Sequence, residues 1–492
     1  MAFAEEQPLL RPALEDLEDG GVRHTEVILD FDPEGDDENP REWPTAFKWA
    51  IVLLLACMAF TVTFTCISVV PVAGTIADDL DHGSGSSPAT ALLVTIWELG
   101  EAAGPLLIAP LSEVFGRYPV MNAANVLFIA ATLLAAISQS TPMFIAARAL
   151  TGLAVASNVL NPAILGDMFE SDERGSAMSL IMLAPLIGGA VGPAISGAIA
   201  QTLGWRQVLF IAAGLATACE ILFLTCFRET YKMAILRRRA AKMRLEAGDG
   251  ADSKHDSHHT EHRNLNKLLH SITRPFAVLF GSSVLLLMSL FGSVLFSYFY
   301  TMSVTLPDIL QDVYGFTPAQ TGLAFFSFSI GSFCSVIVCN RLLDKIFIQL
   351  RGDSKANGKP EYRLPLAIIG AFTMPIAVFA YGWTAELALP VPLLLLSVAF
   401  LGFTLMLATV PLSAYVVDAC GLYSASAMTG IIVTRCLMGT FLPLATGPLK
   451  ENFGYGWGFT VLAALSLALA PIPAFVMKYG EAWRQSSEYT KA

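Results

Sequence analysis

At 492 residues the chain is long enough for two or more soluble domains, but 54% of its residues are hydrophobic and only 14% are charged. This composition points to lipid rather than water as the solvent, and it argues against an ordinary soluble globular protein. The formal net charge of -11 says nothing about a ligand, because residues 1–42 alone carry fourteen acidic side chains and three arginines.

The chain begins with this acidic segment. Residues 1–45 lack periodic apolar positions, so they are predicted to form a disordered tail. The tail has no basic stretch of the kind that opens a signal peptide, and the first apolar run must therefore act as the insertion signal.

Long apolar runs follow, each of about the 20 residues that a helix needs to cross a bilayer. The first six lie near 47–70, 89–110, 119–138, 143–165, 176–200 and 206–227. The next six lie near 276–302, 318–340, 364–383, 389–412, 422–446 and 457–478. The pattern predicts an all-α integral membrane protein with twelve transmembrane helices in two six-helix bundles, residues 46–227 and 276–480. A hydrophilic linker at 228–275 joins them, and a short tail at 481–492 ends the chain.

The basic residues of the loops predict the orientation, because Lys and Arg are retained on the cytoplasmic side. Segment 228–275 holds eleven of them and segment 341–363 holds six, whereas loops 71–88 and 303–317 hold none. Both tails are therefore predicted to be cytoplasmic. Two equal halves joined by a linker also suggest an internal repeat, in which two bundles move around a central site.

A charged motif closes the second span, in the sequence Pro110-Leu-Ser-Glu113-Val-Phe-Gly116-Arg117. A carboxylate and a guanidinium in a tight cytoplasmic turn can pair with each other or with neighbouring helix ends, which predicts a latch that breaks when the bundles separate. Asp167, at the cytoplasmic end of the fourth span, is the natural third member of this gate. A similar charged turn, from Arg341 to Lys345, follows the eighth span.

At this motif the chain resembles the major facilitator superfamily, and more narrowly its fungal drug:proton antiporters with twelve spans. The family signature between the second and third helices, G-x-x-x-D-x-x-G-R-[RK], appears as residues 109–118, with Ala109, Glu113 and Tyr118 in place of the expected residues. Further matches are Asp36-Asp37-Glu38-Asn39-Pro40 with Trp43, Arg148-Ala-Leu-Thr-Gly152, and Asp418, Tyr423, Ser424-Ala-Ser-Ala427, Arg435, Gly439 and Phe441-Leu-Pro-Leu444. The resemblance covers nearly all of residues 37–484 and adds Asp418 to the predicted gate.

The fifth span carries a run of small and helix-bending residues. They are Pro185, Gly188, Gly189, Gly192, Pro193, Ser196 and Gly197. Spacing of four residues places several of them on one face, which lets helices touch closely. The run resembles the family's antiporter motif ending G-P-x-x-G-G, which favours export. Close packing and a direct role in coupling are both open readings.

Ionisable residues inside spans are functional candidates because they are expensive to bury in lipid. Glu98 and Glu101 share one face of the second span, about 22 and 18 Å from Glu113 at about 1.5 Å per residue. Two carboxylates so close in a low dielectric should not both be ionised, so they are candidates for proton coupling. Alternatively, one of them pairs with Arg148 of the fourth span. Arg148 could instead meet an anionic substrate.

Other polar and aromatic residues are candidates for lining a substrate cavity. They are Thr61 and Thr65 of the first span, Asn158 and Asn161 of the fourth, and Tyr298 and Tyr300 of the seventh. Mere packing is the alternative for about half of them. The eight cysteines fall in or beside apolar spans and predict packing rather than a metal site. The four histidines between 255 and 262 could bind a metal but are more typical of a solvated linker.

The sequence predicts a secondary transporter, not an enzyme, that exports a small organic molecule by alternating access. The resemblance implies cargo among drugs, toxins, secondary metabolites, organic acids or polyamines. No cofactor or metal is expected beyond a proton gradient, and no P-loop for ATP is found. The expected partners are the bilayer, protons and the cargo, without nucleic acid, for a monomer in the plasma or vacuolar membrane. The rivals are an importer of the same fold, as symporter or uniporter, and a transport-inactive receptor.

Overall fold

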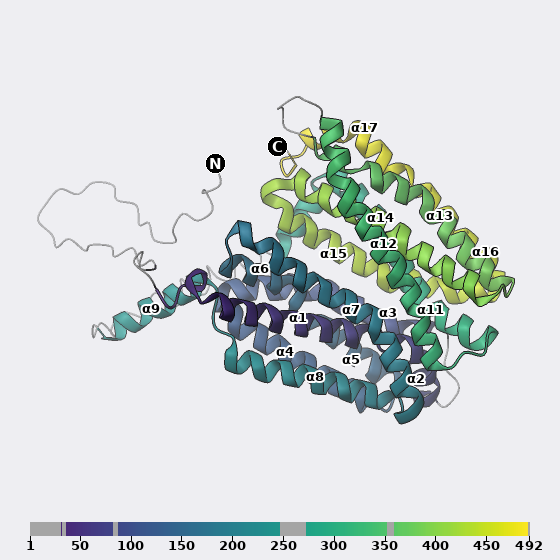
Figure 1. Cartoon of the computed structure of the whole chain (residues 1–492), viewed down its shortest axis with the longest axis horizontal. Helices are drawn as coiled ribbons and strands as arrows, with labels where there is room; N and C mark the ends of the chain where they lie inside the picture. Colours follow the sequence, from purple (N-terminus) through teal and green to yellow (C-terminus); the bar gives the residue numbers. More distant parts are fainter. Residues whose placement is uncertain (1–30, 32–35, 82–86, 247–271, 352–358, 491–492) are drawn as a thin grey trace, which may run out of the picture.

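The computed structural model describes residues 31, 36–81, 87–246, 272–351 and 359–490, and these residues contain helices but no β-strand. Two helical bundles lie one above the other, the N-terminal bundle in purple to teal and the C-terminal bundle in green to yellow (Figure 1). The N-terminal bundle comprises α1 to α8, and the C-terminal bundle comprises α11 to α17. The fold therefore divides in two, with the linker between the halves.

The N-terminal bundle holds six membrane spans. Its helices are α1 (Thr45–Ile67), α2 (Ala73–Leu80), α3 (Ser87–Phe115), α4 (Arg117–Ala136), α5 (Thr141–Leu153), α6 (Ser157–Met168), α7 (Ser171–Leu203) and α8 (Trp205–Cys226). Helices α1 and α2 form one span, and α5 and α6 form another. The α5–α6 span is interrupted at residues 154–156, just before the predicted cavity residues Asn158 and Asn161.

The C-terminal bundle holds the other six. Its helices are α11 (Ser283–Asp308), α12 (Pro318–Arg351), α13 (Pro365–Glu386), α14 (Val391–Cys420), α15 (Ser424–Phe441), α16 (Thr446–Leu469) and α17 (Pro471–Gln485). The stretch Ser424–Gln485 is 62 residues long, well beyond the about 20 residues that one crossing needs. It reverses at Gly454, whose φ of 71° lies in the left-handed region that favours glycine. It therefore makes two crossings, which brings the described residues to twelve spans.

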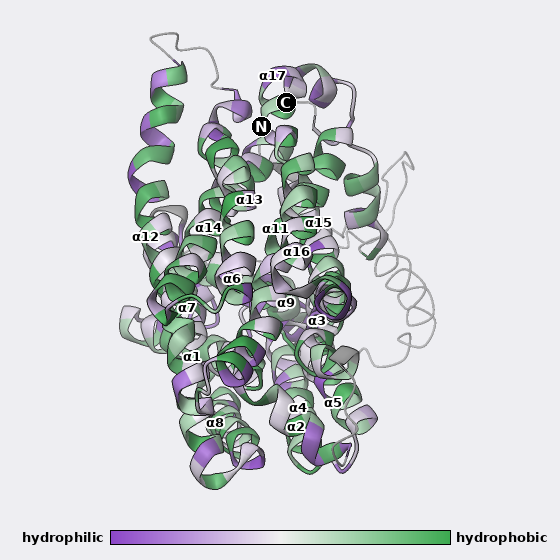
Figure 2. Cartoon of the chain, turned by 90° about the vertical axis from the view of Figure 1, so that its right-hand side faces the viewer, coloured by the Kyte–Doolittle hydropathy of each residue, from purple (hydrophilic) through white to green (hydrophobic). Residues whose placement is uncertain are grey.

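An even number of crossings returns the chain to the end at which it started. We call this end of the bundles, where α1 begins and α17 finishes, the terminal end, and the other the opposite end. Hydrophobic residues cover most of the ribbon of both bundles (Figure 2). Large apolar side chains such as Leu53, Ile221 and Ile330 are more than half exposed on the outer surface. Such a surface suits contact with lipid.

Several boundaries differ from the sequence predictions because tertiary contacts order the flanking segments. Part of the predicted disordered tail is ordered: Asn39 caps a short 3₁₀ helix, Pro40–Glu42, and the buried Trp43 indole donates to the carbonyl of Asp37. The linker contains helix α9 (Lys232–Glu246), while the four histidines lie outside the described residues. The predicted seventh span is divided, since residues 272–280 form a separate helix and Ser282 is extended before α11.

The two bundles meet along α3 and α15 and along α7 and α12. Hydrogen bonds between the bundles are made near the opposite end and towards the middle. Gln311 donates to the carbonyl of Pro71 over 3.1 Å, and Thr440 donates to the carbonyl of Thr95 over 3.4 Å. Among the described residues, no hydrogen bond joins the two bundles at the terminal end. The bundles are therefore fastened at one side.

Candidate functional site

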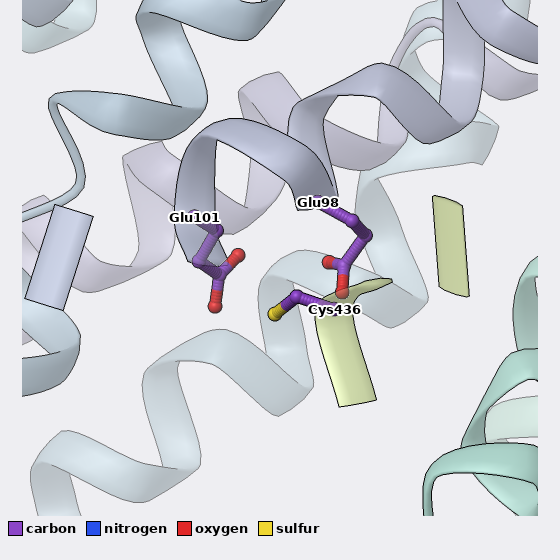
Figure 3. A group of neighbouring side chains, drawn as sticks. All are labelled: Glu98, Glu101 and Cys436. Carbon is purple, nitrogen blue, oxygen red and sulfur yellow. The ribbon is translucent and has the colours of Figure 1, made fainter. Parts of the chain in front are cut away.

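Glu98 and Glu101 lie on the face of α3 that meets the C-terminal bundle, where Cys436 of α15 approaches them (Figure 3). Glu98 is 2% exposed, Glu101 is 8% exposed and Cys436 is fully buried. One ligand atom from each of the three lies within 4.8 Å of the others. Gly439, one turn further along α15, also lies beside Glu98, since a Cβ there would stand 3.4 Å from Glu98 Oε2, in van der Waals contact.

Glu98 connects the two bundles directly. The Tyr300 hydroxyl of α11 donates a hydrogen bond of 2.6 Å to Glu98 Oε1. Glu98 Oε2 is buried and has no hydrogen-bond partner among the described residues. Burying a polar oxygen without a partner is costly, so this oxygen marks a position where a proton or a ligand would be stabilising. The predicted cavity residue Tyr300 thus belongs to the same cluster as the predicted carboxylates.

Glu101 is much better satisfied than Glu98. Asn158 donates to Glu101 Oε1 over 2.7 Å, and the Trp97 indole donates to Glu101 Oε2 over 3.2 Å. The Arg435 guanidinium lies 3.8 Å from Glu101 Oε1. Two hydrogen bonds and one ion pair thus satisfy this carboxylate. The two glutamates therefore have different environments although they are three residues apart.

Arg435 of α15 is the basic residue of this cluster, and the sequence pattern did not distinguish it from a structural arginine. Its side chain is 31% exposed and its guanidinium lies 4.2 Å from the ring centroid of Phe296. Its Nε is buried without a hydrogen-bond partner among the described residues. An arginine can donate five hydrogen bonds, so Arg435 retains capacity to bind a further acceptor.

Arg148 pairs with neither carboxylate. It is 1% exposed and donates to the backbone carbonyls of Leu93, Thr65 and Cys66 over 3.4, 3.0 and 2.8 Å. The last two carbonyls belong to the final turn of α1, where helix carbonyls lack partners within the helix. Arg148 also lies 4.8 Å from the Trp97 ring centroid. The alternative in which Arg148 neutralises Glu98 or Glu101 is therefore wrong.

The other predicted cavity residues are divided between the interior of the bundles and their interface. Thr61 donates to the carbonyl of Cys57 and faces Cys219 inside the N-terminal bundle, and the Tyr298 hydroxyl donates to the carbonyl of Leu462 inside the C-terminal bundle. Thr65 donates within its own helix. Asn161 is buried with its Oδ1 unpartnered. Only Asn158 and Tyr300 of this predicted set bond to the glutamate pair.

A latch lies at the terminal end of the N-terminal bundle. Arg117, at the start of α4, pairs with Asp167 of α6 over 3.4 Å and donates to the Ser112 hydroxyl over 2.5 Å. Gly116 has φ 101°, and a Cβ at this position would collide with the carboxylate of Glu229. Glu113 is exposed and makes no ion pair with the described residues, so of the two predicted alternatives Arg117 takes the pairing with a neighbouring helix end, at Asp167, and not the pairing with Glu113.

Glu229, which sequence reasoning missed, takes the place expected for Glu113. Its carboxylate accepts from the backbone N–H groups of Arg117 over 2.8 Å and Tyr118 over 3.3 Å. These are the first N–H groups of α4, which have no partner within the helix, so Glu229 caps α4 from a distant segment. An acidic residue at the start of a basic linker was the only sequence signal for this role.

The C-terminal bundle repeats the latch. Arg363, just before α13, pairs with Asp418 at the end of α14 over 2.8 Å and with Asp344 of α12 over 2.7 Å. Arg363 precedes the ninth span and Asp418 ends the tenth, as Arg117 begins the third and Asp167 ends the fourth. The predicted gate residue Asp418 thus works within its own bundle. The correspondence supports the internal repeat.

The small residues of the fifth span pack α7 against two neighbours. A Cβ at Gly188 would stand 3.0 Å from the carbonyl oxygen of Phe60 in α1, while Gly192 lies against Phe64. Towards the opposite end, a Cβ at Gly197 would collide with the carbonyl of Pro318, which begins α12. Ser196 is fully buried and bonds to the carbonyl of Pro193, and Gly189 faces Ile67. Pro185 is half-buried in the same helix.

Glu98, Glu101 and Cys436 together resemble a metal-ligand set in spacing. However, Arg435 already brings a positive charge to within 3.8 Å of Glu101. A second cation at this place would be repelled by the guanidinium. The charge pattern therefore suits an ion-pair and proton site better than a metal site.

Comparison with known proteins places this architecture in a family. The sequence model of the Major Facilitator Superfamily matches residues 51–443. The efflux pump radE of Floropilus chiversii is 33% identical over 465 residues, covering 94% of this chain and 86% of the relative. The MFS transporter prlG of a fungal species is 34% identical over 472 residues, covering 93% and 96%.

The fold is also found among solved structures. The crystal structure of a D-xylose-proton symporter superposes with a TM-score of 0.65 at 14% identity, covering 88% of this chain and 97% of that one. The match to the family extends over most of the chain, and it includes the latch residues and the central cluster. The chain therefore belongs to the Major Facilitator Superfamily, and it is a membrane transporter rather than an enzyme.

Proposed function

We propose that this transporter exports a small organic molecule from the cytoplasm in exchange for protons, with Glu98 as the proton carrier. The observation that carries the proposal is the position of Glu98. Its Oε1 accepts the Tyr300 hydrogen bond that joins the bundles, and its Oε2 is buried without a partner. A single titratable group therefore contributes to closing the carrier.

The charges of the cluster support one exchangeable proton. Glu101 and Arg435 form one pair of opposite charges, 3.8 Å apart. An ionised Glu98 would leave one net negative charge in a buried place, and a proton on Oε2 would remove it. Arg148 does not compensate it, because its guanidinium is bound to backbone carbonyls.

The hydrogen bond between Glu98 and Tyr300 links this proton to the movement of the bundles. A charged acceptor makes a hydrogen bond roughly twice as strong as a neutral one. Ionised Glu98 therefore holds α3 to α11 and keeps the opposite end closed. Protonation weakens this contact, and a cargo that displaces the tyrosine breaks it. A carrier that is both empty and ionised stays closed, which is the condition for exchange rather than leakage.

Arg435, Asn158 and Phe296 are the groups that we propose for contact with cargo. Arg435 is partly exposed with unused donor capacity, Asn158 is exposed beside Glu101, and Phe296 supplies an apolar surface. A mostly apolar molecule with a few acceptor groups suits such a site. This agrees with the broad set of drugs, toxins, secondary metabolites and organic acids. No cofactor is proposed beyond the proton gradient.

The proposed direction of transport and the proposed orientation in the membrane rest on the basic residues at the terminal end and on the relatives. The basic residues of α9, and Lys345 near the end of α12, lie at the terminal end. Because Lys and Arg are retained on the cytoplasmic side, we place both chain ends in the cytoplasm. Fastening at the opposite end then leaves the site facing the cytoplasm, from which an exporter collects cargo. One matched relative is named an efflux pump. We propose the plasma membrane as the location and a monomer as the working unit.

Transport into everted vesicles tests this function. An inward-acid pH gradient should drive accumulation of the cargo, identified as the metabolite that a deletion strain retains relative to its parent. Accumulation driven only by the reversed gradient would make the protein an importer. Purified protein that moves no cargo in liposomes would support the receptor reading instead.

A further inference from the structure

A pocket of about 610 Å³ lies outside the central cluster, where residues 36–43, the end of α8 and helix α9 meet. Four cations line it, namely Arg228, Arg238, Arg239 and Lys242. Arg228 follows α8 by two residues, so the mouth of the pocket lies just beyond the membrane-spanning part of the protein. No function assigned so far uses this pocket.

The acidic groups of the pocket are largely occupied. Glu229 accepts from the backbone N–H groups of Arg117, Tyr118, Thr230 and Tyr231. Arg239 forms ion pairs with two acidic residues of the N-terminal segment, Asp36 over 2.8 Å and Glu38 over 2.8 Å. Hydrogen bonding to Asp36 raises the pKa of Arg239 above its ordinary value.

Three cations remain with donor capacity facing the pocket. Arg238 is 59% exposed and only 3.7 Å from Glu229, Lys242 is exposed on the same helix, and the exposed Arg228 lies over the Phe47 ring at 5.4 Å. Asp37 is the one acidic lining group that makes no ion pair with the described residues. The side chains that line the pocket are thus four cations and three carboxylates, a net charge of about +1 that favours an anion.

We propose that this pocket binds a phosphate monoester, carried either by an inositol phospholipid or by a small phosphate in solution. A phosphate monoester brings nearly two negative charges and three acceptor oxygens in one small group. Arginine suits its oxygens through paired N–H donors, and lysine as a point charge. Clusters of basic residues beside a membrane span attract anionic lipids in the same way.

Binding to the purified full chain in phosphatidylcholine nanodiscs tests the proposal. The probes are inorganic phosphate, a short-chain phosphatidylinositol phosphate, and acetate as a carboxylate control, measured by calorimetry at low salt. The double variant Arg238→Gln with Lys242→Gln should weaken phosphate binding by about a hundredfold, if each charge-assisted contact is worth about tenfold. Asp37→Asn should tighten it, and acidification below about pH 6 should weaken it because the phosphate gains a proton.

Arg237→Gln is the matched control, because it removes the same charge from α9 at a residue that does not line the pocket and donates instead to the carbonyl of Val114. Binding of the inositol lipid alone would identify the membrane as the source, and equal binding of inorganic phosphate would identify a soluble ligand. No binding of either probe, equal binding of acetate, or equal losses in Arg237→Gln and the double variant would overturn the proposal. Unchanged melting temperatures exclude misfolding as the cause of a loss.

Discussion

Replacing Glu98 by Gln should uncouple transport from protons while leaving the carrier able to move cargo. Gln has nearly the shape of a protonated glutamic acid, and its side-chain oxygen can still accept from Tyr300. The buried negative charge is lost, so the strong closed contact is lost with it. We expect the variant to behave as a permanently protonated carrier.

The size of the effect follows from the charge count of the cluster. With Glu101 paired to Arg435, one proton is exchanged for each cargo molecule. One pH unit then stores about 1.4 kcal/mol, which supports about a tenfold concentration ratio for a neutral cargo. Two exchanged protons would support about a hundredfold. The Glu98→Gln variant should reach a ratio of about one.

The assay uses proteoliposomes with the membrane potential clamped and a pH gradient of one unit, and it compares accumulation with counterflow of labelled cargo. Glu220→Gln is the matched control. Glu220 is a buried carboxylate of α8 that accepts from Asn125 over 2.8 Å, away from the bundle interface. We expect Glu98→Gln to lose accumulation and keep counterflow, and Glu220→Gln to keep both.

Two results would refute this reasoning. Accumulation by Glu98→Gln at the level of the unmodified protein would show that Glu98 does not carry the proton. Loss of accumulation with intact counterflow in Glu101→Gln alone would transfer the role to the neighbouring carboxylate. Our own expectation for Glu101→Gln is a loss of counterflow as well, because Arg435, Asn158 and Trp97 then lose a charged partner.

Three further substitutions test other contacts. Tyr300→Phe should weaken the closure between the bundles by about 1.5–3 kcal/mol, the value of a hydrogen bond to a charged group. The accessibility of cysteine side chains at the opposite end to a labelling reagent should therefore rise, and unchanged accessibility would contradict this. Gly322→Ala should lower the melting temperature, because the new Cβ would collide with the carbonyl of Pro193, and an unchanged melting curve would count against close packing there. Glu229→Gln should destabilise the protein by about 1–3 kcal/mol by weakening the cap of α4, and a denaturant titration without a shift would argue against that cap.

The twelve spans could be predicted because lipid imposes a length and an apolar composition on every crossing helix. The predicted division into two bundles of six is confirmed by the family match and by the fold. Boundaries were less predictable, since they depend on contacts with other segments. Trp43 is ordered by its indole bond to Asp37, and α17 extends through Arg484, whose guanidinium pairs with the buried Glu361 over 3.1 Å.

The candidate site was predicted only in part. Glu98 and Glu101 were found because charge is rare inside a span and because residues three apart share a helix face. Their partners come from α6, α11 and α15, and no local pattern identifies which residues of distant helices meet. Arg148 appeared as a suitable partner for the same carboxylates but binds the carbonyls at the end of α1 instead.

By itself the sequence determined what the lipid bilayer dictates: the number of spans, the two halves, and the presence of carboxylates inside spans, which are functional candidates because they are costly to bury. Tertiary structure alone decided which of the two glutamates is fully satisfied and which retains an unpartnered oxygen. It also put Glu229 rather than Glu113 at the start of α4. The physical reason is that hydropathy and helical period act along the chain, whereas the hydrogen bonds and ion pairs of a polar site are made between residues that the sequence keeps far apart.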